Sequence, residues 1–309
     1  GVQTCALPIS LIFLKRPMVE TGRKYVFDFD STLTRVEALD VLAEMTLQGN
    51  PKRNEIVAEI QKITNLGIDG DISFTESLER RIRLLSANKS DLENLVKELR
   101  QKISKSIEAN KQFFHEFSED IYVISCGFKE FIDPIVEEYN IPSERVYANT
   151  FKFDTDGNII GFDETNVLAA HNGKIECLKN LDLDGEVQVI GDGYSDYVMR
   201  EAGIAHKFFA YTENVHREKA ANNADHVTPN LDEFLYINDL PRNLSYPKNR
   251  IKILLLENVH TAAFDNLSEE GFSVELIKTS LSEDELIERI KGVHVLGIRS
   301  KTQVTQKVL

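Results

Sequence analysis

The chain has 309 residues, of which 42% are hydrophobic and 28% charged, and its formal net charge is −14. This length suffices for two domains with a sizeable core, whereas the acidic balance argues against a general surface for nucleic acid or anionic membranes. Three cysteines without metal-ligand spacing favour a reducing compartment, so we expect a cytoplasmic protein.

The N-terminal segment carries neither a membrane span nor a signal peptide by its pattern. No apolar run reaches the ~18 residues of a transmembrane helix, and the apolar stretch 5–14 lacks a basic flank and a small-residue cleavage site. Residues 1–9, GVQTCALPI, match the translation of a common sequencing-adapter oligonucleotide. We therefore expect residues 1–10 to be a non-native leader, with the native start at Met18 or upstream of Leu11.

The elements from residue 25 onward alternate between strands and helices. We predict a strand at 25–29, a four-helix insert at 37–110, a strand at 121–124, and a hairpin formed by 146–153 and 158–162. A helix from Asn172 to about Leu181, a strand at 186–190, a helix capped by Ser195 and a strand at 207–211 follow. This order predicts an α/β fold with a Rossmann-like parallel sheet.

A polar, proline-bearing linker at 241–250 precedes a second unit. There the pattern predicts strands at 251–256, 273–277 and 293–298 and helices at 261–270 and 282–290. We expect residues 251–309 to be a partial second α/β domain, because the segment is too short for a complete enzyme domain.

Charged and hydroxyl residues follow several of the predicted strands. Asp28 and Asp30 come after the first strand, Ser125 after the second, and Asp192 after a later one, while Lys174 opens a helix. Ligands of open α/β sheets bind beyond the carboxyl ends of the strands. Two carboxylates about 4 Å apart repel by about 4 kcal/mol at an effective dielectric constant near 20. A hard cation such as Mg²⁺ is therefore expected between them.

Each of these residues also has an ordinary structural interpretation. A D-x-D string is usually a solvated turn, and a single lysine is usually a surface residue. A lysine in the first turn, however, opposes the helix dipole, so helix stability does not explain Lys174. The occurrence of all four signals in this order favours a functional site.

The order D-x-D-S-T, a hydroxyl after a strand, lysine and G-D-G-x-x-D resembles the haloacid-dehalogenase-type phosphatase superfamily, over residues from about 20 to 240. The helical insert resembles the cap domain of that superfamily. The resemblance implies a phosphatase at 18–240, with its core at 18–36 and 111–240 and its cap at 37–110. An inactive relative is the alternative.

The resemblance also implies roles for these residues. Asp28 is expected to be the nucleophile that forms an aspartyl-phosphate, and Asp30 the group that protonates the leaving alkoxide and then activates water. Mg²⁺ is the expected cofactor, bound by Asp28, the backbone carbonyl of Asp30, and Asp192.

Further residues are expected to bind the phosphate or to support those that do. Ser125, with the backbone around Cys126, is expected to hold the phosphate beside the positive charge of Lys174. Asp196 is expected to orient Lys174 or a metal-bound water, with Ser195 beside it. The chain has Cys126 where relatives often have glycine and Ser195 where they usually have asparagine. Both replacements are small, so we expect activity to be retained.

The cap sequence resembles that of phosphoserine phosphatases. Glu37 is expected to meet the substrate ammonium group, and Arg81, in the segment FTESLERR, the substrate carboxylate. Phe74 is expected to pack in the core with one edge lining the pocket. Taken singly, a glutamate at a helix start is usually a dipole partner, and Glu-Arg-Arg is usually a solvated face.

The tail resembles the beginning of D-3-phosphoglycerate dehydrogenases at 251–260 and 297–302, which places Arg299 and Lys301 in the substrate-anion region of that family. Both are otherwise ordinary surface charges. The nicotinamide-binding G-x-G-x-x-G is absent, so we expect no dehydrogenase activity from this chain, and a longer bifunctional natural protein.

The expected function is Mg²⁺-dependent hydrolysis of O-phospho-L-serine to L-serine and phosphate. The expected partner is thus a small phosphorylated metabolite, with no nucleic acid and no membrane. Alternatives are hydrolysis of another small phosphate ester and a non-catalytic domain that binds phosphorylated metabolites of the serine pathway. The intact D-x-D and Lys174 argue against the non-catalytic alternative, because binding alone needs no nucleophile.

Overall fold

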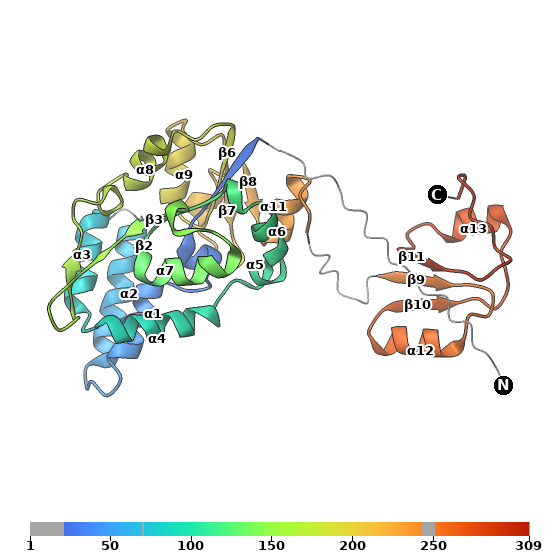
Figure 1. Ribbon diagram of the computed structural model, residues 1–309, viewed down its shortest axis with the longest axis horizontal. Helices are drawn as coiled ribbons and strands as arrows, with labels where there is room; N and C mark the ends of the chain where they lie inside the picture. The colour runs from blue at the N-terminus through green and yellow to red at the C-terminus, as the bar shows by residue number, and fades with distance from the viewer. Residues whose placement is uncertain (1–21, 70, 243–250, 309) are drawn as a thin grey trace. The chain divides into compact units, whose positions relative to one another are not determined.

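The computed structural model describes residues 22–69, 71–242 and 251–308 (Figure 1). The chain divides into two compact units, Gly1–Arg242 and Asn243–Leu309. The predicted leader at 1–10, the predicted start near Met18 and most of the predicted linker at 241–250 lie outside the described residues.

The first unit is built on a six-stranded sheet with the order β3-β2-β1-β6-β7-β8 (Figure 1), in which all neighbouring strands are parallel. Its strands are β1 (Arg23–Phe27), β2 (Ile121–Phe128), β3 (Val146–Asn149), β6 (Glu186–Gly191), β7 (Lys207–Tyr211) and β8 (His226–Thr228). Because side chains alternate along a strand, Tyr25 and Phe27 are buried on one face of the sheet and Val26 on the other. The predicted parallel sheet is confirmed.

Helices cover both faces of this sheet. The core around Tyr25 and Phe27 includes residues from α5, α6, α7 and α11, whereas the core around Val26 includes residues from α8, α9 and α10. The helices are α5 (Lys105–Ala109), α6 (Lys111–Glu116), α7 (Lys129–Val136), α8 (Gly173–Leu181), α9 (Tyr194–Glu201), α10 (Glu218–Ala221) and α11 (Leu231–Ile237). Single 3₁₀ turns occur at Ser118–Asp120, Glu137–Tyr139, Ser143–Arg145 and Val167–Ala169.

The predicted helical insertion after the first strand is confirmed. It follows the irregular turn η1 (Phe29–Leu33) and consists of α1 (Ala38–Thr46), α2 (Arg53–Asp69), α3 (Phe74–Leu84) and α4 (Lys89–Arg100). Apolar residues at helical spacing, such as Leu92, Leu95 and Leu99 of α4, are buried, as the periodicity predicts. The helix α5, which lies within the predicted cap range, contacts α11 of the core.

Two local predictions were wrong. The predicted strand 146–153 is split, because β3 is buried beside β2 in the main sheet, while β4 (Phe151–Phe153) leaves it to pair with β5 (Ile159–Phe162). Ser195 does not cap α9, which already begins at Tyr194. The carboxylate of Asp196 closes this helix end instead, since its Oδ2 accepts from the backbone N–H of Gly193 (3.0 Å).

The second unit is a three-stranded parallel sheet with the order β10-β9-β11. Its elements are β9 (Lys252–Leu255), α12 (Thr261–Glu269), β10 (Ser273–Leu276), α13 (Glu283–Arg289) and β11 (Val295–Gly297). Its core is small and is formed around Leu254, Leu256, Leu286 and Val308. A partial α/β unit was predicted here, and the prediction is confirmed.

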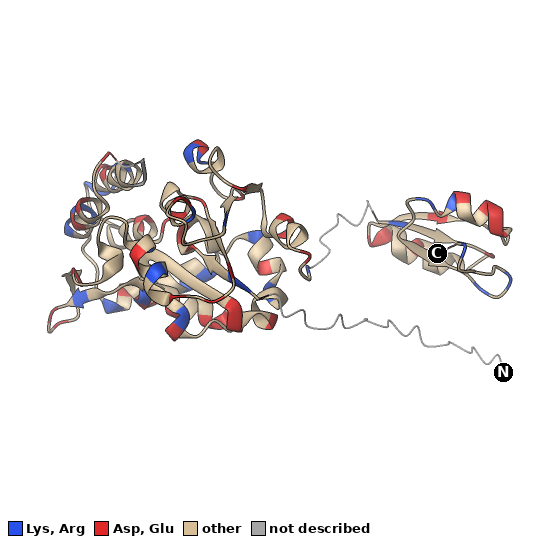
Figure 2. Cartoon of the chain, turned by 90° about the horizontal axis from the view of Figure 1, so that it is seen from above, with Lys and Arg blue, Asp and Glu red and all other residues tan. Residues whose placement is uncertain are grey.

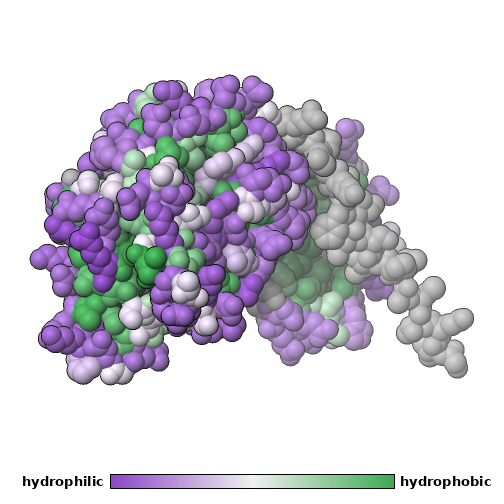
Figure 3. Space-filling view, turned by 60° about the vertical axis from the view of Figure 1, so that its left-hand side comes forward, coloured by the Kyte–Doolittle hydropathy of each residue, from purple (hydrophilic) through white to green (hydrophobic). Residues whose placement is uncertain are grey.

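Acidic and basic residues are distributed along both units (Figure 2). Figure 3 shows the first unit from the side that carries α3, where polar residues cover most of the surface with apolar patches between them. Within the described ranges, no helix combines the length and apolar character that a membrane crossing requires.

Candidate active site

The turn after β1 presents the two aspartates of the D-x-D motif. The Asp28 backbone N–H donates to Ile190 O of β6 (2.9 Å), and the Phe29 N–H donates to Asp28 Oδ1 (2.7 Å). The chain then bends at Ser31, whose φ of 56° lies in the left-handed region. This bend places Asp28 and Asp30 on the wall of one cavity.

That cavity encloses about 600 Å³ between core and cap. Ten of the residues predicted from the sequence line it: Asp28, Asp30, Glu37, Phe74, Arg81, Ser125, Cys126, Lys174, Asp192 and Ser195. The remaining predicted residue, Asp196, is fully buried next to the cavity wall, where it contacts Lys174. The structure therefore brings all the predicted residues of the first unit together.

Lys174 is a buried cation between two carboxylates. Its Nζ lies 3.0 Å from Asp28 Oδ1 and 2.6 Å from Asp196 Oδ1, and the residue is 3% exposed. Burial alone lowers the pKa of a lysine, but the two carboxylates outweigh it and hold the pKa of Lys174 well above its usual value. Lys174 is therefore a fixed positive charge beside Asp28.

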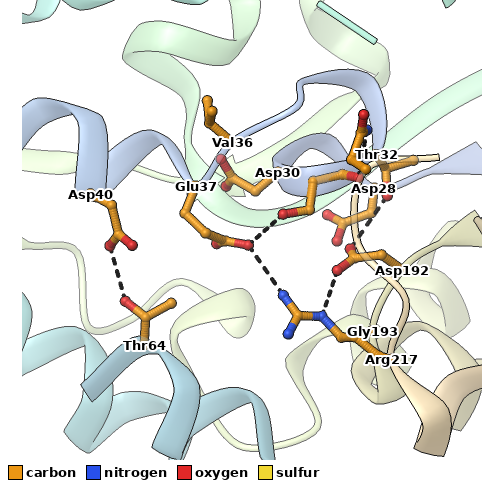
Figure 4. A network of polar contacts seen from close by, with 12 residues as sticks. Asp28, Asp30, Thr32, Val36, Glu37, Asp40, Thr64, Asp192, Gly193 and Arg217 are labelled. Carbon is orange, nitrogen blue, oxygen red and sulfur yellow. Dashed lines mark hydrogen bonds and ion pairs between the residues drawn. The ribbon is translucent and has the colours of Figure 1, made fainter. Parts of the chain in front are cut away.

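Carboxylate oxygens of Asp28, Asp192 and Asp196 lie within 4.8 Å of one another. Burial, followed by the negative charges of Glu37 and Asp28, raises the pKa of Asp192 to about 7. The negative charges of these carboxylates repel one another, and a divalent cation would relieve this repulsion. Carboxylate oxygens are the ligands that a hard cation such as Mg²⁺ prefers, so the residues present fit the predicted metal. Asp192 Oδ2 also accepts from Arg217 Nε (2.7 Å), and its Oδ1 accepts from the Thr32 hydroxyl (3.4 Å) (Figure 4).

Asp30 is partly buried and lies on the cap side of the turn. Its Oδ1 accepts from the backbone N–H of Ala38 (2.8 Å), at the start of α1. Burial, with a further contribution from the negative charge of Glu37, raises the pKa of Asp30 well above its usual value. A carboxyl group in this state keeps its proton to a higher pH than an ordinary carboxyl group, which favours a general acid.

The irregular C-terminal part of β2, which continues past the predicted strand end at Ile124, closes another side of the cavity. The Gly127 backbone N–H donates to Ser125 Oγ (3.0 Å), and Ser125 is 1% exposed. A Cβ atom at Gly127 would lie 3.0 Å from Asp30 Oδ2, so this backbone approaches the acid closely. Burial raises the pKa of the Cys126 thiol to about 12, which keeps it protonated.

The cap side of the cavity holds groups of both charges. Glu37 Oε1 accepts from the Ser31 hydroxyl (2.8 Å) and lies 3.5 Å from Arg217 Nη2 (Figure 4). Arg81 is 7% exposed, and its Nε donates to Ser77 O of its own helix (3.4 Å). Burial lowers the pKa of Arg81, although the carboxylate of Glu37 partly opposes this effect. Phe74, in contrast, is only partly buried and packs on the core cluster.

Comparison with known families now decides the class of the chain. The model of the haloacid dehalogenase-like hydrolases matches residues 25–201, more than half of the chain. The chain belongs to this family. A second model, of the catalytic domain of D-isomer specific 2-hydroxyacid dehydrogenases, matches residues 253–309.

Individual relatives of this haloacid dehalogenase-like hydrolase agree with both family matches, one relative for each part of the chain. The chain is 32% identical over 202 residues to "Phosphoserine phosphatase, chloroplastic" of Arabidopsis thaliana, covering 64% of this chain and 66% of that protein. It is 63% identical over 65 residues to "D-3-phosphoglycerate dehydrogenase" of Dictyostelium discoideum, covering 21% of this chain but only 16% of that enzyme. The chain thus spans less than two thirds of either relative.

A solved structure supports the hydrolase fold. The "phosphoserine phosphohydrolase-like protein" of Francisella tularensis is 34% identical with a TM-score of 0.63, covering 70% of this chain and 99% of that one. The predicted resemblance to phosphoserine phosphatases, with a tail similar to D-3-phosphoglycerate dehydrogenase, is confirmed.

The sequence reasoning assigned no role to Arg217 and Gly127, which line the cavity, or to Thr32, which contacts Asp192. Arg217 contacts Asp192 and Glu37 from the segment after β7, where no motif marks it. Gly127 and Thr32, in contrast, directly follow motif residues. The glycine after Ser125-Cys126 and the second hydroxyl of the D-S-T string were the available signals.

The charges predicted in the tail lie in the second unit. Arg299 and Lys301 are exposed there. The backbone N–H groups of Ser300 (2.7 Å), Lys301 (2.9 Å) and Thr302 all donate to the carboxylate of Glu257. Glu257 thus fixes the conformation of this loop within the unit.

Proposed function

We propose that the first unit hydrolyses O-phospho-L-serine to L-serine and phosphate. The observation that carries the proposal is the placement of Glu37 and Arg81 in the same cavity as Asp28 and Lys174. A carboxylate and a guanidinium complement the ammonium and carboxylate groups of an amino acid, while Lys174 complements a phosphate. The printed names of the Arabidopsis and Francisella relatives support this substrate.

The proposed chemistry has two steps. An oxygen of the Asp28 carboxylate attacks phosphorus, the bond from phosphorus to the serine oxygen breaks, and Asp30 gives its proton to that oxygen. Asp30 then takes a proton from water, whose oxygen attacks the phosphorus, and the bond to Asp28 breaks to release inorganic phosphate. The raised pKa of Asp30 suits the first of these proton transfers.

Mg²⁺ is the proposed cofactor, and it would neutralise the negative charge that phosphate and carboxylates bring together. Asp28, the carbonyl of Asp30, and Asp192 are the proposed ligands. Ser125 and the backbone at Cys126 are proposed to bind phosphate oxygens together with Lys174. The short contact from Asp196 to Lys174 supports a positioning role for Asp196, and Ser195 lies next to it in α9.

Three esters test the substrate assignment. Arg81→Met is expected to lower kcat/KM for O-phospho-L-serine about 100-fold, because the substrate carboxylate loses its partner, but to leave phosphoethanolamine unchanged, which has no carboxylate. Glu37→Gln is expected to affect O-phospho-L-serine and phosphoethanolamine but not O-phospho-3-hydroxypropionate, which has no amino group.

Arg83→Met is the matched control for Arg81, since Arg83 lies on the same helix with its side chain 76% exposed. Arg83→Met should leave kcat/KM unchanged for all three esters. Equal rates of the wild-type chain on all three esters would contradict the proposed roles of Glu37 and Arg81 and would indicate a phosphatase of another small ester.

The tail extends the proposal to a pathway. The Arabidopsis relative of the first unit is named a phosphoserine phosphatase, and the Dictyostelium relative of the second unit is named a D-3-phosphoglycerate dehydrogenase. We propose that the phosphatase acts in serine biosynthesis, as the last step of a route whose first enzyme the tail resembles.

A further inference from the structure

The cap is joined to the core by two chain segments that lie side by side. Residues 33–36 lead into the cap and residues 102–104 lead out of it, and we call this pair the hinge ladder. Two backbone hydrogen bonds connect them, from Arg35 N to Lys102 O (2.7 Å) and from Ser104 N to Leu33 O (2.9 Å). Because the cap carries Arg81, this ladder contributes to the position of Arg81 relative to Asp28, together with the packing of α4 on α7 and of α2 on α9.

The side chain of Asn214, just beyond β7, contacts both segments. Its Nδ2 lies 2.9 Å from Ser31 O, 3.3 Å from Thr34 O and 2.7 Å from Ser104 Oγ. Carbonyl oxygens only accept hydrogen bonds, so the amide nitrogen must face them. The Ser104 hydroxyl donates its hydrogen to Thr32 O (2.6 Å), so its oxygen accepts from Asn214.

These contacts hold a part of the backbone that is costly to form. Ser31 has a φ of 56°, a region that is unfavourable for a residue other than glycine, so the surrounding contacts must stabilise it. Ser31, Thr34 and Ser104 are at most 2% exposed, so their acceptors cannot turn to water instead. Asn214 Nδ2, which carries two hydrogens, lies within hydrogen-bond distance of all three acceptors.

The neighbouring residue, Glu213, binds the chain directly after the hinge ladder. Its carboxylate accepts from the backbone N–H of Ser106 (3.1 Å), from the Ser106 hydroxyl and from the Tyr211 hydroxyl (2.6 Å). Ser106 lies at the beginning of α5, directly after the hinge ladder. Two consecutive core residues, Glu213 and Asn214, thus hold the turn after Asp28 and the segment that leads out of the cap.

We propose that Asn214 is a positioning residue that aligns the cap with the nucleophile by fixing the hinge ladder and the turn at Ser31. It touches neither Asp28 nor Arg81 in the contacts above and acts through Ser31, Thr34 and Ser104. The kinetic part of its test rests on the proposed phosphoserine phosphatase activity.

The kinetic test compares a substrate that uses the cap with one that does not. In the full chain, Asn214→Ala should lower kcat/KM for O-phospho-L-serine by about 10- to 100-fold, mainly through KM, because Arg81 and Glu37 lose their alignment. For p-nitrophenyl phosphate, which has no amino or carboxylate group, the loss should be at least about fivefold smaller than for O-phospho-L-serine, because only the turn at Ser31 and not the cap contributes to it. Asn214→Asp should be at least as harmful, since its carboxylate would face acceptor oxygens.

Asn223→Ala is the matched control, because Asn223 is exposed and its amide donates only locally, to Lys219 O (2.7 Å). This variant should resemble the wild type on both substrates. Equal losses on both substrates in Asn214→Ala, with a lower melting temperature, would show general structural support and overturn the positioning role.

Hydrogen exchange tests the same role without any substrate. In Asn214→Ala, the backbone amides of Arg35 and Ser104 should exchange faster, while those of β1 stay protected. If the wild-type chain fails to turn over O-phospho-L-serine, the proposed function is wrong, and the exchange result still decides on Asn214. Unchanged exchange at Arg35 and Ser104 would overturn the positioning role.

Discussion

Asp30 places a partly buried carboxyl group at the junction of core and cap. Its proposed proton transfer makes a prediction that separates the two chemical steps. With p-nitrophenyl phosphate, whose leaving group departs without a proton, Asp30→Asn should still form the aspartyl-phosphate but hydrolyse it about 10²- to 10⁴-fold more slowly. Rapid mixing should therefore reveal a burst close to one nitrophenolate per site. If Asp30→Asn turned over p-nitrophenyl phosphate at the wild-type rate and without a burst, this role of Asp30 would be contradicted.

Cys126 makes a prediction about reactivity. Because burial raises the pKa of its thiol to about 12, very little thiolate exists at neutral pH. Iodoacetamide should modify Cys126 at least about 100-fold more slowly than a free small thiol, measured by mass spectrometry of the tryptic peptide. Rapid alkylation that phosphate prevents would indicate an activated thiol and would contradict the assigned environment.

At the scale of the element, helix α4 of the cap begins with a capping box. The Asn88 side chain accepts from Asp91 N (3.2 Å), and Asp91 Oδ2 accepts from Asn88 N (2.9 Å). Asn88→Ala should lower the free energy of unfolding by about 1 kcal/mol in urea denaturation. Asn94→Ala, in the exposed interior of the same helix, should be neutral or slightly stabilising, and an equal loss would count against the cap.

The elements also show how far sequence reasoning reaches. The ends of β1 and β6 were predictable because carboxylates interrupt the apolar runs there, whereas β2 continues past the predicted end at Ile124 to Phe128. The contacts of Arg217 and Asn214 were not predictable, since both follow β7 in an irregular segment and meet their partners only through the fold. The split between β3 and β4 likewise depends on which strand neighbours β2, which the local pattern does not encode.

At the scale of the whole molecule, every proposed catalytic residue lies in the first unit. A chain that ends at Arg242 should therefore keep the melting temperature of the first unit unchanged and the kcat/KM of the proposed phosphatase within about twofold. Differential scanning calorimetry and a phosphate-release assay check this prediction. A shorter chain that aggregates or loses activity would show that the second unit supports the first.

Phosphate release from O-phospho-L-serine tests the central claim most directly. It should be measured with Mg²⁺, after chelation and repletion, and in an Asp28→Asn variant whose fold is verified by circular dichroism. The account predicts Mg²⁺-dependent turnover that the variant loses by at least about 10³-fold, because the nucleophile is gone. Turnover that survives in Asp28→Asn, or none in the folded wild-type chain with Mg²⁺, would contradict it.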